Sequence, residues 1–429
     1  MPRPAELAPR DAPPPPGTRV VIDLRPLQEP ERTPITAAYL DRLLRAFAER
    51  PLPGESFVAV LRALRDDPAD ELEALGLPMA GRRRVPPTAR LLRSGGLTLD
   101  SFLLRGAEVG TGVGADASGA AGTLYHTAGG AVPLASRLPV VATLLDLAPW
   151  ELPDVYARSA AARFGHRLRA RILRDATRLI VCSTATAESA RRRVHIRAER
   201  IVVIPLAADD AFSPAAAERS AEVCQRLGLP ARYLVFAGRY DARKDLGTLF
   251  AALRSLREER PAADSATDPW PPVVVLAGGD EAESEALARA AARNGVGDLV
   301  RRTPYLSPPD LAALEAAARG FVFPAVSEGT GLATVEALAV GTPVIASRTG
   351  PLPEIVGNAG IVVEPRDPAR LAAALRSFWQ DERIHTQLAR AAQKRARGPR
   401  RTWHDVARET RAVYAAAVKE ATRVAPSGW

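Results

Sequence analysis

The chain has 429 residues, of which 47% are hydrophobic and 25% are charged, and its formal net charge is +9. This length exceeds the ~250–300 residues at which a single hydrophobic core stops growing, so two domains of ordinary size are expected. The composition is typical of a soluble globular protein, and no apolar run approaches the ~20 residues of a membrane span. The only two cysteines, Cys182 and Cys224, suggest neither a metal site nor a disulfide framework, so a cytoplasmic location is expected.

Arginine carries almost all of the positive excess, because lysine occurs only at positions 244, 394 and 419. Such an excess attracts polyanions, and an anionic membrane surface, a diphosphate substrate and nucleic acid all remain open on this ground alone. The sequence has no zinc-finger spacing and no basic stretch interleaved with aromatic residues. Nucleic acid is therefore not expected as a partner.

The N-terminal part of the chain has the pattern of a parallel α/β domain. Residues 1–17 lack the apolar core of a signal peptide and are expected to form a disordered tail. Short apolar runs predict strands at 19–23, 57–61, 139–145, 179–182 and 200–204, and apolar residues at helical spacing predict a helix over 36–48. Residues 82–98 are expected to be a connection, and the small residues of 106–122 a mobile loop.

Two polar side chains of this part come after short apolar runs. Asp146 directly follows the strand predicted for 139–145, and His126 falls just after another short apolar run. A lone histidine can also serve as a structural hydrogen-bonding residue, so both interpretations of His126 stay open.

Residues 155–178 have a helical pattern with two different faces. Phe164, Leu168 and Ile172 lie on one face, and arginines recur on the adjacent face, at positions 163, 167, 171, 174 and 178. The basic face is explained either by simple solvation or by docking to an anionic bilayer that carries a lipid-linked acceptor. Near such a surface each basic residue contributes roughly 1 kcal/mol.

The C-terminal part repeats the α/β pattern. Strands are predicted at 233–237, 273–277, 320–323, 343–347 and 360–363 within a sheet of about six strands, and helices at 309–318, 371–378 and 404–421. Gly238, Arg239 and Lys244 follow the first of these strands. They lie where open α/β sheets bind ligands, at the carboxyl end of a strand.

The strand predicted for 320–323 leads through a glycine-containing loop into a short helix that Gly341 closes. A helix that starts in this way offers backbone N–H groups and the positive end of its dipole to an anion, so a phosphate is the expected ligand. Glu328 lies before the helix and Glu336 within it, roughly 10 Å apart along the helix axis. Such a pair could bond the hydroxyls of a sugar and a ribose at the two ends of a diphosphate.

The segment SEGTGLATVEALAVGTPVIASRTGPLPEIVGNAGIVVEP, residues 327–365, resembles the donor-site signature of the family 4 retaining glycosyltransferases. The resemblance implies an α/β protein with the GT-B fold, in which two Rossmann-like domains with parallel sheets face each other across a cleft. It also implies that Glu328 contacts the donor sugar and that Glu336 holds the ribose hydroxyls. The remaining donor-binding residues of this loop would be Gly329, Thr330, Gly331 and Leu332.

The stretch GRYDARKD, residues 238–245, is similar to the Gly-Arg and Lys-Asn motif of the same family. The resemblance implies that Gly238 lies in the donor site and that Arg239 and Lys244 neutralise the donor diphosphate. Cations fixed beside a departing diphosphate favour the transition state electrostatically. Arg239, Lys244 and Glu328 are therefore the expected catalytic residues. Residues 303–307 correspond to the base-contacting loop, so backbone groups near Tyr305 either bind the base or form a plain strand-to-helix turn.

The expected function is transfer of a sugar from a nucleoside diphosphate sugar to a hydroxyl of a glycan or lipid-linked acceptor, with retention at the anomeric carbon. Residues 18–208 would form the acceptor domain, 209–402 the donor domain, and 403–429 a helix that returns to the first domain. No cofactor is expected, and the absence of an Asp-x-Asp sequence disfavours a metal-dependent GT-A mechanism. The protein could work at the inner face of a membrane as a peripheral enzyme.

The family pattern is not matched everywhere. Leu145 precedes Asp146 where the family has a histidine that lines the catalytic cleft, so the resemblance makes Asp146 and His126 the candidates for lining that cleft. The loop at 33–36 lacks the usual glycines. A second interpretation therefore stays open, in which the chain is a weak or inactive homologue that binds a nucleotide sugar or a partner glycosyltransferase. A GT-B sugar-nucleotide epimerase fits the segment PEIVG, residues 353–357, less well.

Overall fold

The structure is a computed structural model, and it describes residues 17–85, 122–129, 136, 138–259, 270–279 and 281–424. The tail expected over 1–17 and the loop expected over 106–122 lie outside these ranges except for their last residues. The chain divides into two units. We call Met1–Leu206 with Trp403–Trp429 the N-terminal unit, and Ala207–Thr402 the C-terminal unit.

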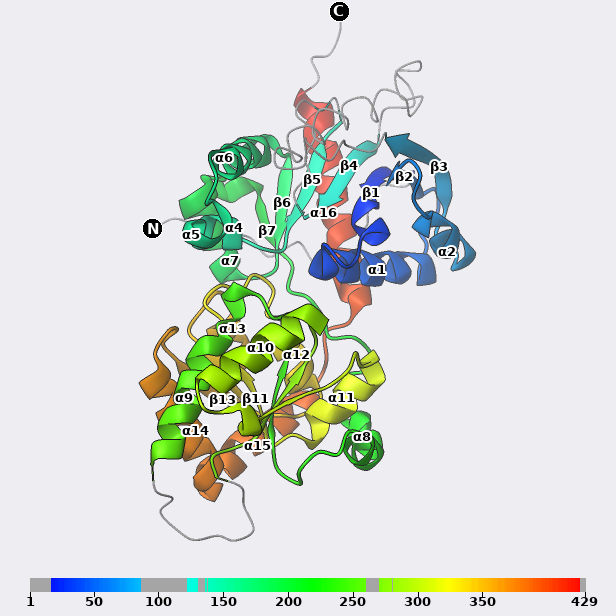
Figure 1. Ribbon diagram of the computed structural model, residues 1–429. Helices are drawn as coiled ribbons and strands as arrows, with labels where there is room; N and C mark the ends of the chain where they lie inside the picture. Colours follow the sequence, from blue (N-terminus) through cyan, green and yellow to red (C-terminus); the bar gives the residue numbers. More distant parts are fainter. Residues whose placement is uncertain are drawn as a thin grey trace, which may run out of the picture. The chain divides into compact units, whose positions relative to one another are not determined.

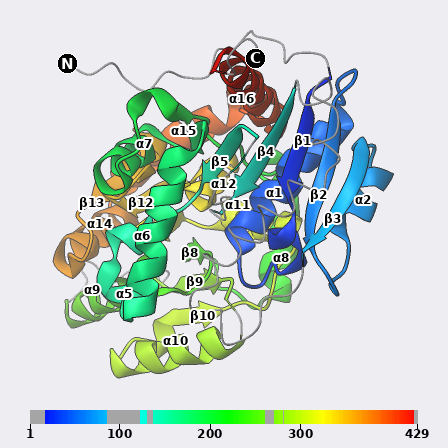
Figure 2. The same ribbon diagram turned by 90° about the horizontal axis from the view of Figure 1, so that it is seen from above.

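The N-terminal unit is built on a parallel sheet of seven strands in the order β3-β2-β1-β4-β5-β6-β7 (Figures 1 and 2). The strands are β1 (Arg19–Asp23), β2 (Ser56–Arg62), β3 (Met79–Val85), β4 (Thr123–Ala128), β5 (Val140–Leu144), β6 (Arg178–Val181) and β7 (Ile201–Val203). The central strands β4 and β5 are buried along their whole length. β5 was predicted from its apolar run. β4 contains two threonines and His126, which lies within the strand and not after it as expected.

Helices connect these strands. They are η1 (Arg25–Gln28), α1 (Pro34–Glu49), α2 (Pro68–Ala74), α4 (Ala148–Glu151), α5 (Pro153–Tyr156), α6 (Ala160–Asp175), α7 (Thr184–Ser189), η3 (Ala190–Val194) and η4 (Ala198–Arg200). The last helix, α16 (Trp403–Val424), packs against α1, β4 and β5 of the same unit (Figure 1). A buried ion pair from Arg411 Nη2 to Glu55 Oε2, at 2.5 Å, ties α16 to the segment before β2.

Two expectations for the N-terminal unit need correction. Part of the connection expected over 82–98 is the edge strand β3, whose residues alternate between exposed and half-buried positions. Its exposed arginines hid it from a search for apolar runs, and Arg82 is held there by carboxylates of Asp67, Asp70 and Glu73. The helix expected over 155–178 is shorter: α5 ends at Tyr156, and α6 starts after Ser159, whose hydroxyl accepts a hydrogen bond from Ala162 N. Arg178, expected on the basic face of this helix, is the first residue of β6.

The C-terminal unit contains a parallel sheet of six strands in the order β10-β9-β8-β11-β12-β13, as predicted in number. The strands are β8 (Leu234–Ala237), β9 (Val274–Ala277), β10 (Val300–Arg302), β11 (Gly320–Phe323), β12 (Val344–Ser347) and β13 (Gly360–Val363). Its helices are η5 (Pro214–Arg219), α8 (Ser220–Arg226), η6 (Ala242–Lys244), α9 (Leu246–Glu258), α10 (Glu281–Arg293), η7 (Gly297–Leu299), α11 (Pro308–Ala317), α12 (Leu332–Ala339), α13 (Leu352–Val356), α14 (Pro368–Gln380) and α15 (Glu382–Arg397).

In the second sheet the order of the strands reverses between β8 and β11, which lie side by side. Phe236 on β8 stacks on Phe323 on β11, with ring centroids 5.6 Å apart, so the core is continuous across this junction. At such a junction the connections that follow the two strands run in opposite directions. They leave a crevice beyond the carboxyl ends of the strands. The loops that follow β8 and β11 hold most of the residues singled out from the sequence.

Candidate active site

The loop after β8 is shaped by glycines that let backbones approach closely. Gly238 follows the strand with φ of +137°, a conformation that side chains disfavour. A Cβ on Gly278, at the end of β9, would lie 2.4 Å from Gly238 O, so only glycine fits there. These contacts fix the direction in which the loop leaves the sheet.

Lys244 ends the short helix η6 in this loop, and its side chain is buried against β11. Its Nζ donates a hydrogen bond to Glu328 Oε2 at 2.6 Å, with side chains only 7% and 4% exposed. The same ammonium lies 4.4 Å from the centre of the Phe323 ring. The two loops are also joined through their backbones, since Val326 N donates to Arg243 O at 2.7 Å. Lys244 and Glu328 therefore form one buried charge pair at the junction of β8 and β11.

Glu328 is held on both oxygens. Oε2 accepts from Lys244, and Oε1 accepts from Thr330 N, Thr330 Oγ1 and Gly331 N at 3.0–3.2 Å. Burial by itself would raise the pKa of this carboxyl, but the charges of Lys244 and Arg243 and these hydrogen bonds outweigh it and lower the pKa to about 2. Glu328 is thus a fixed anion at any physiological pH.

The start of α12 differs from the expectation in one respect. The backbone N–H groups of Thr330 and Gly331 are not left open for a phosphate, because they donate to Glu328. The N–H of Leu332 donates to Thr330 Oγ1 at 3.3 Å. The positive end of the helix dipole therefore acts first on the Glu328 carboxylate. Gly329 is buried in the same turn, between Glu328 and Thr330.

Arg239 does not join the Lys244–Glu328 pair. Its guanidinium is 41% exposed and binds Glu283 Oε1 of α10 at 2.6 Å. Arg243 is buried instead, and its Nε donates to Asp241 Oδ2 at 2.8 Å. Arg243 is close enough for its charge to lower the pKa of Glu328. The sequence marked Arg239 and Lys244 as the cationic pair, whereas Arg243 is the second cation that acts on Glu328 in this structure.

Glu336 lies within α12 and is buried. Its charge faces a residue that the sequence did not single out, Glu315 of α11, which is fully buried. Neither carboxyl oxygen of Glu315 has a hydrogen-bond partner among the described residues. Burial first, and the charge of Glu336 second, raise the pKa of Glu315 well above its ordinary value. A glutamate in the otherwise apolar run AALEAAA, residues 312–318, was the available signal.

Gly350, before α13, also supports the site. Its φ is +50°, and a Cβ there would lie 2.0 Å from Glu328 O. The backbone of Glu328 thus rests on a position that only glycine can occupy. Tyr305, by contrast, is 88% exposed in the turn after β10, so its ring has no fixed place in the described structure.

The two cleft candidates of the N-terminal unit have different environments. His126 on β4 is fully buried; its Nδ1 is 2.6 Å from Tyr414 Oη and its Nε2 is 3.0 Å from Thr143 Oγ1. Burial lowers its pKa to about 3, against the opposing charge of Asp23, so the ring is neutral. These contacts favour the structural interpretation of His126. Asp146 follows β5 and is half-buried. Its Oδ1 accepts a hydrogen bond at 2.7 Å from the N–H of Ala148, the first residue of α4.

A search of the described residues finds no group of three or more histidine, cysteine, aspartate or glutamate side chains arranged to hold a metal ion. The loops after β8 and β11 instead bring together two buried cations, Lys244 and Arg243, with their carboxylate partners Glu328 and Asp241. This arrangement suits an anionic ligand that carries hydroxyl groups.

Comparison with known families agrees with this site. Residues 225–395 match the family described as glycosyl transferases group 1, and residues 119–212 match glycosyltransferase family 4. The chain belongs to the group 1 glycosyltransferases of family 4, which confirms the resemblance of the donor-site segment.

Individual relatives carry more specific names. A D-inositol 3-phosphate glycosyltransferase of Streptomyces avermitilis is 37% identical over 261 residues, which are 58% of this chain and 53% of the relative. The O-antigen chain mannosyltransferase B of Escherichia coli is 28% identical over 243 residues, 56% of this chain and 61% of the relative. The chain thus spans about half the length of the curated relatives it matches.

Solved structures confirm the fold. Sucrose-phosphate synthase from Thermosynechococcus elongatus aligns with a TM-score of 0.66 and 21% identity, over 91% of this chain and 96% of that one. Anabaena Alr3699/HepE, solved in complex with UDP-glucose, aligns with a TM-score of 0.62 and 17% identity, over 92% and 98%. The two parallel sheets are those of the GT-B fold, as the resemblance implied. The cleft between the domains stays a prediction.

Proposed function

We propose that this protein is a retaining glycosyltransferase that moves a sugar from a nucleoside diphosphate sugar to a hydroxyl of a glycan or lipid-linked acceptor. The observation that carries the proposal is the buried Lys244–Glu328 pair at the junction of β8 and β11. Ligands of open α/β sheets bind at such a junction. Family membership supports the same reaction class.

The proposed roles follow from charge. Lys244 would neutralise the β-phosphate of the donor as the bond to the sugar breaks, because a fixed cation stabilises the charge that develops on the leaving group. Arg239 would bind the same diphosphate once its guanidinium leaves the Glu283 carboxylate for a phosphate oxygen. Glu328, held in position by its three donors to Oε1, would accept hydrogen bonds from sugar hydroxyls, and Glu336 from the ribose.

Retention would follow from attack on the face from which the diphosphate leaves, guided by the phosphates, since no enzymic nucleophile is identified. Gly329, Thr330, Gly331 and Leu332 would shape the sugar pocket. Gly238 would let the backbone approach the diphosphate, and backbone groups near Tyr305 would contact the base. The acceptor would bind the N-terminal unit.

A thermal-shift screen against UDP-, GDP- and dTDP-sugars tests donor binding, because a ligand of the folded state raises its apparent stability by mass action. The donor that binds is then used in a transfer reaction, and proton NMR of the product shows the configuration at its anomeric carbon. The proposal predicts an α-linked product from an α-linked donor and loss of turnover in Lys244→Ala. An inverted product would contradict it.

A second candidate is a homologue that binds a nucleotide sugar or a partner glycosyltransferase without turnover. Leu145 favours it, because a buried apolar side chain precedes Asp146 where the family has a histidine. Calorimetric binding of a donor, together with no hydrolysis and no transfer across a panel of donors and acceptors, would establish this candidate in place of the enzyme.

A further inference from the structure

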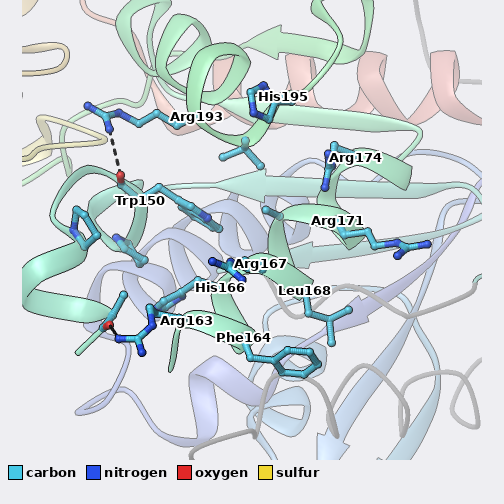
Figure 3. Close-up of a pocket in the computed structure, with 15 residues that line it drawn as sticks. Trp150, Arg163, Phe164, His166, Arg167, Leu168, Arg171, Arg174, Arg193 and His195 are labelled. Carbon is cyan, nitrogen blue, oxygen red and sulfur yellow. Dashed lines mark hydrogen bonds between the residues drawn. The ribbon is translucent and has the colours of Figure 1, made fainter. Parts of the chain in front are cut away.

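A groove with a volume of about 720 Å³ lies on the outside of the N-terminal unit, among α4, α5, α6 and the residues that end η3 (Figure 3). Among the described residues, its lining includes two histidines, five arginines and no carboxylate. The arginines are Arg163, Arg167, Arg171, Arg174 and Arg193. Four of them lie on α6, and Arg193 and His195 come from the opposite side of the groove (Figure 3).

None of these five arginines is ion-paired within the part of the chain that the structure describes. Arg163 Nη1 donates to the carbonyl oxygens of Ala157 and Arg158, and Arg193 Nη1 to that of Trp150 at 3.1 Å. Other exposed arginines do have carboxylate partners, as Arg257 has in Asp298 at 2.7 Å. Like charges crowded together without counter-charges repel each other, so the groove is suited to an anionic partner.

The opposite face of α6 anchors the helix. Arg169 donates to Gly129 O at 2.7 Å, and its guanidinium lies 5.1 Å from the centre of a Trp150 ring. Ile172 and Leu173 are buried in the core of the same unit. These contacts attach the helix to the unit through the face opposite the arginines.

An aromatic side chain accompanies the charge. Phe164 is 63% exposed and follows Arg163 at the rim of the groove (Figure 3). Trp150 and Leu168 add apolar lining below it. A basic helix face with an exposed aromatic residue beside it is the pattern of helices that lie in a membrane interface. No helix in the described ranges has the length and apolar character needed to cross a bilayer.

We propose that the outer face of α6 and this groove dock on a bilayer that contains anionic lipids. Headgroup phosphates would be bound by the five guanidinium groups, which can bond phosphate oxygens in pairs, and Phe164 would enter the boundary between headgroups and acyl chains. A free phosphate compound would use the arginines but leave Phe164 in water. Nucleic acid would call for several aromatic side chains for base stacking, and the groove exposes one. The docking surface does not depend on the proposed sugar transfer.

Co-sedimentation with vesicles tests the proposal. The full chain is mixed with vesicles of phosphatidylcholine alone, or of phosphatidylcholine and phosphatidylglycerol in equal parts. The variant replaces Arg163, Arg167, Arg171 and Arg174 by glutamine. A matched control variant removes the same number of charges from exposed positions on α15. It replaces Arg383, Arg390, Lys394 and Arg397 by glutamine. Circular dichroism checks that each variant is folded.

We expect binding to the anionic vesicles only, and a loss of roughly 100- to 1000-fold in the partition coefficient for the α6 variant at low salt. The α15 control should bind like the unchanged protein. Phe164→Ala should weaken binding about tenfold at unchanged charge, since it removes only apolar burial.

Equal loss in the α6 and α15 variants would overturn the proposal, because it would show a response to net charge alone. No binding to anionic vesicles would overturn it too. A third result would also overturn it: inorganic phosphate or an oligonucleotide at low concentration displaces the protein from vesicles, and Phe164→Ala has no effect on binding. The groove would then be a site for a dissolved anion. None of these results depends on turnover, so failure of the docking surface and failure of the proposed reaction are distinguishable.

Discussion

Replacing Glu328 by glutamine removes one charge from the buried pair with Lys244 and keeps the size of the side chain. The pKa of Glu328 is about 2, against an ordinary value of 4.5. Each pKa unit corresponds to about 1.4 kcal/mol, so the ionised carboxylate contributes about 3 kcal/mol to the stability of the C-terminal unit at neutral pH. This agrees with the ~3–5 kcal/mol that breaking a buried ion pair costs. Glu328→Gln should therefore lower the free energy of unfolding by about 3 kcal/mol.

The effect should depend on pH with a definite sign. The folded-state pKa of Glu328 lies below the unfolded-state value, so its contribution is present above pH 4.5 and is lost as the pH falls towards 2. By about pH 3, roughly 2 kcal/mol of the difference between the unchanged protein and Glu328→Gln should have disappeared. The variant carries no titrating group at this position, so the difference isolates Glu328 from the other carboxylates.

Urea unfolding followed by tryptophan fluorescence measures this difference, and hydrogen exchange of the amides in β8 and β11 assigns the transition to the C-terminal unit. Glu364→Gln is the matched control, because Glu364 pairs with Arg348 at the surface with side chains 52% and 57% exposed. The control should change stability by less than about 1 kcal/mol. A Glu328→Gln effect no larger than that of the control, or one that is the same near pH 7 and near pH 3, would refute the reasoning.

Three further substitutions have expected outcomes. Glu315→Met should stabilise the protein by about 1–3 kcal/mol, because it removes a buried carboxyl without partners. The raised pKa of Glu315 makes the gain larger at pH 8 than at pH 5 in the same urea assay, since the unfolded glutamate loses its proton at a lower pH than the folded one. Gly350→Ala should lower the melting temperature and weaken donor binding by pushing on Glu328 O, whereas Gly357→Ala, with a similar φ and nothing within 4 Å, should cost only the backbone strain of about 1–3 kcal/mol. Glu283→Gln should tighten donor binding several-fold in calorimetry by releasing Arg239, and an unchanged or weaker affinity would argue against a role for Arg239 at the diphosphate.

The sequence was sufficient for the parts of the fold in which both faces of a strand are buried. Strands β1, β11 and β12 lie within one residue of where apolar runs predicted them, because a strand of a parallel sheet that is covered by helices needs apolar side chains on both faces. The buried strand β4 was missed because threonines and His126 interrupt its apolar run. Edge strands do not share that requirement. β3 and β10 carry exposed arginines, so neither contains an apolar run that would predict it.

The candidate site was predictable to a similar degree. The strand order puts the loops after β8 and β11 next to each other, so residues 84 positions apart, Lys244 and Glu328, meet at 2.6 Å. Which charges pair was not predictable, because Arg239 can reach a carboxylate on α10 that no motif marks. The partnerless carboxyl of Glu315 was equally hidden, since burial of one face of α11 is decided by packing against its neighbours.

The pairing of Lys244 with Glu328 also bears on how a donor would bind. A buried ammonium without a counter-charge is costly, so Glu328 stabilises Lys244 when no diphosphate is present. A diphosphate that approached Lys244 would compete with Glu328 Oε2, while the three hydrogen bonds to Oε1 would still hold the carboxylate in place. Glu328 would then have one oxygen released for a sugar hydroxyl in the same step that Lys244 turns to phosphate. On this argument the two residues act as one unit, and their substitutions should be far from additive in donor binding.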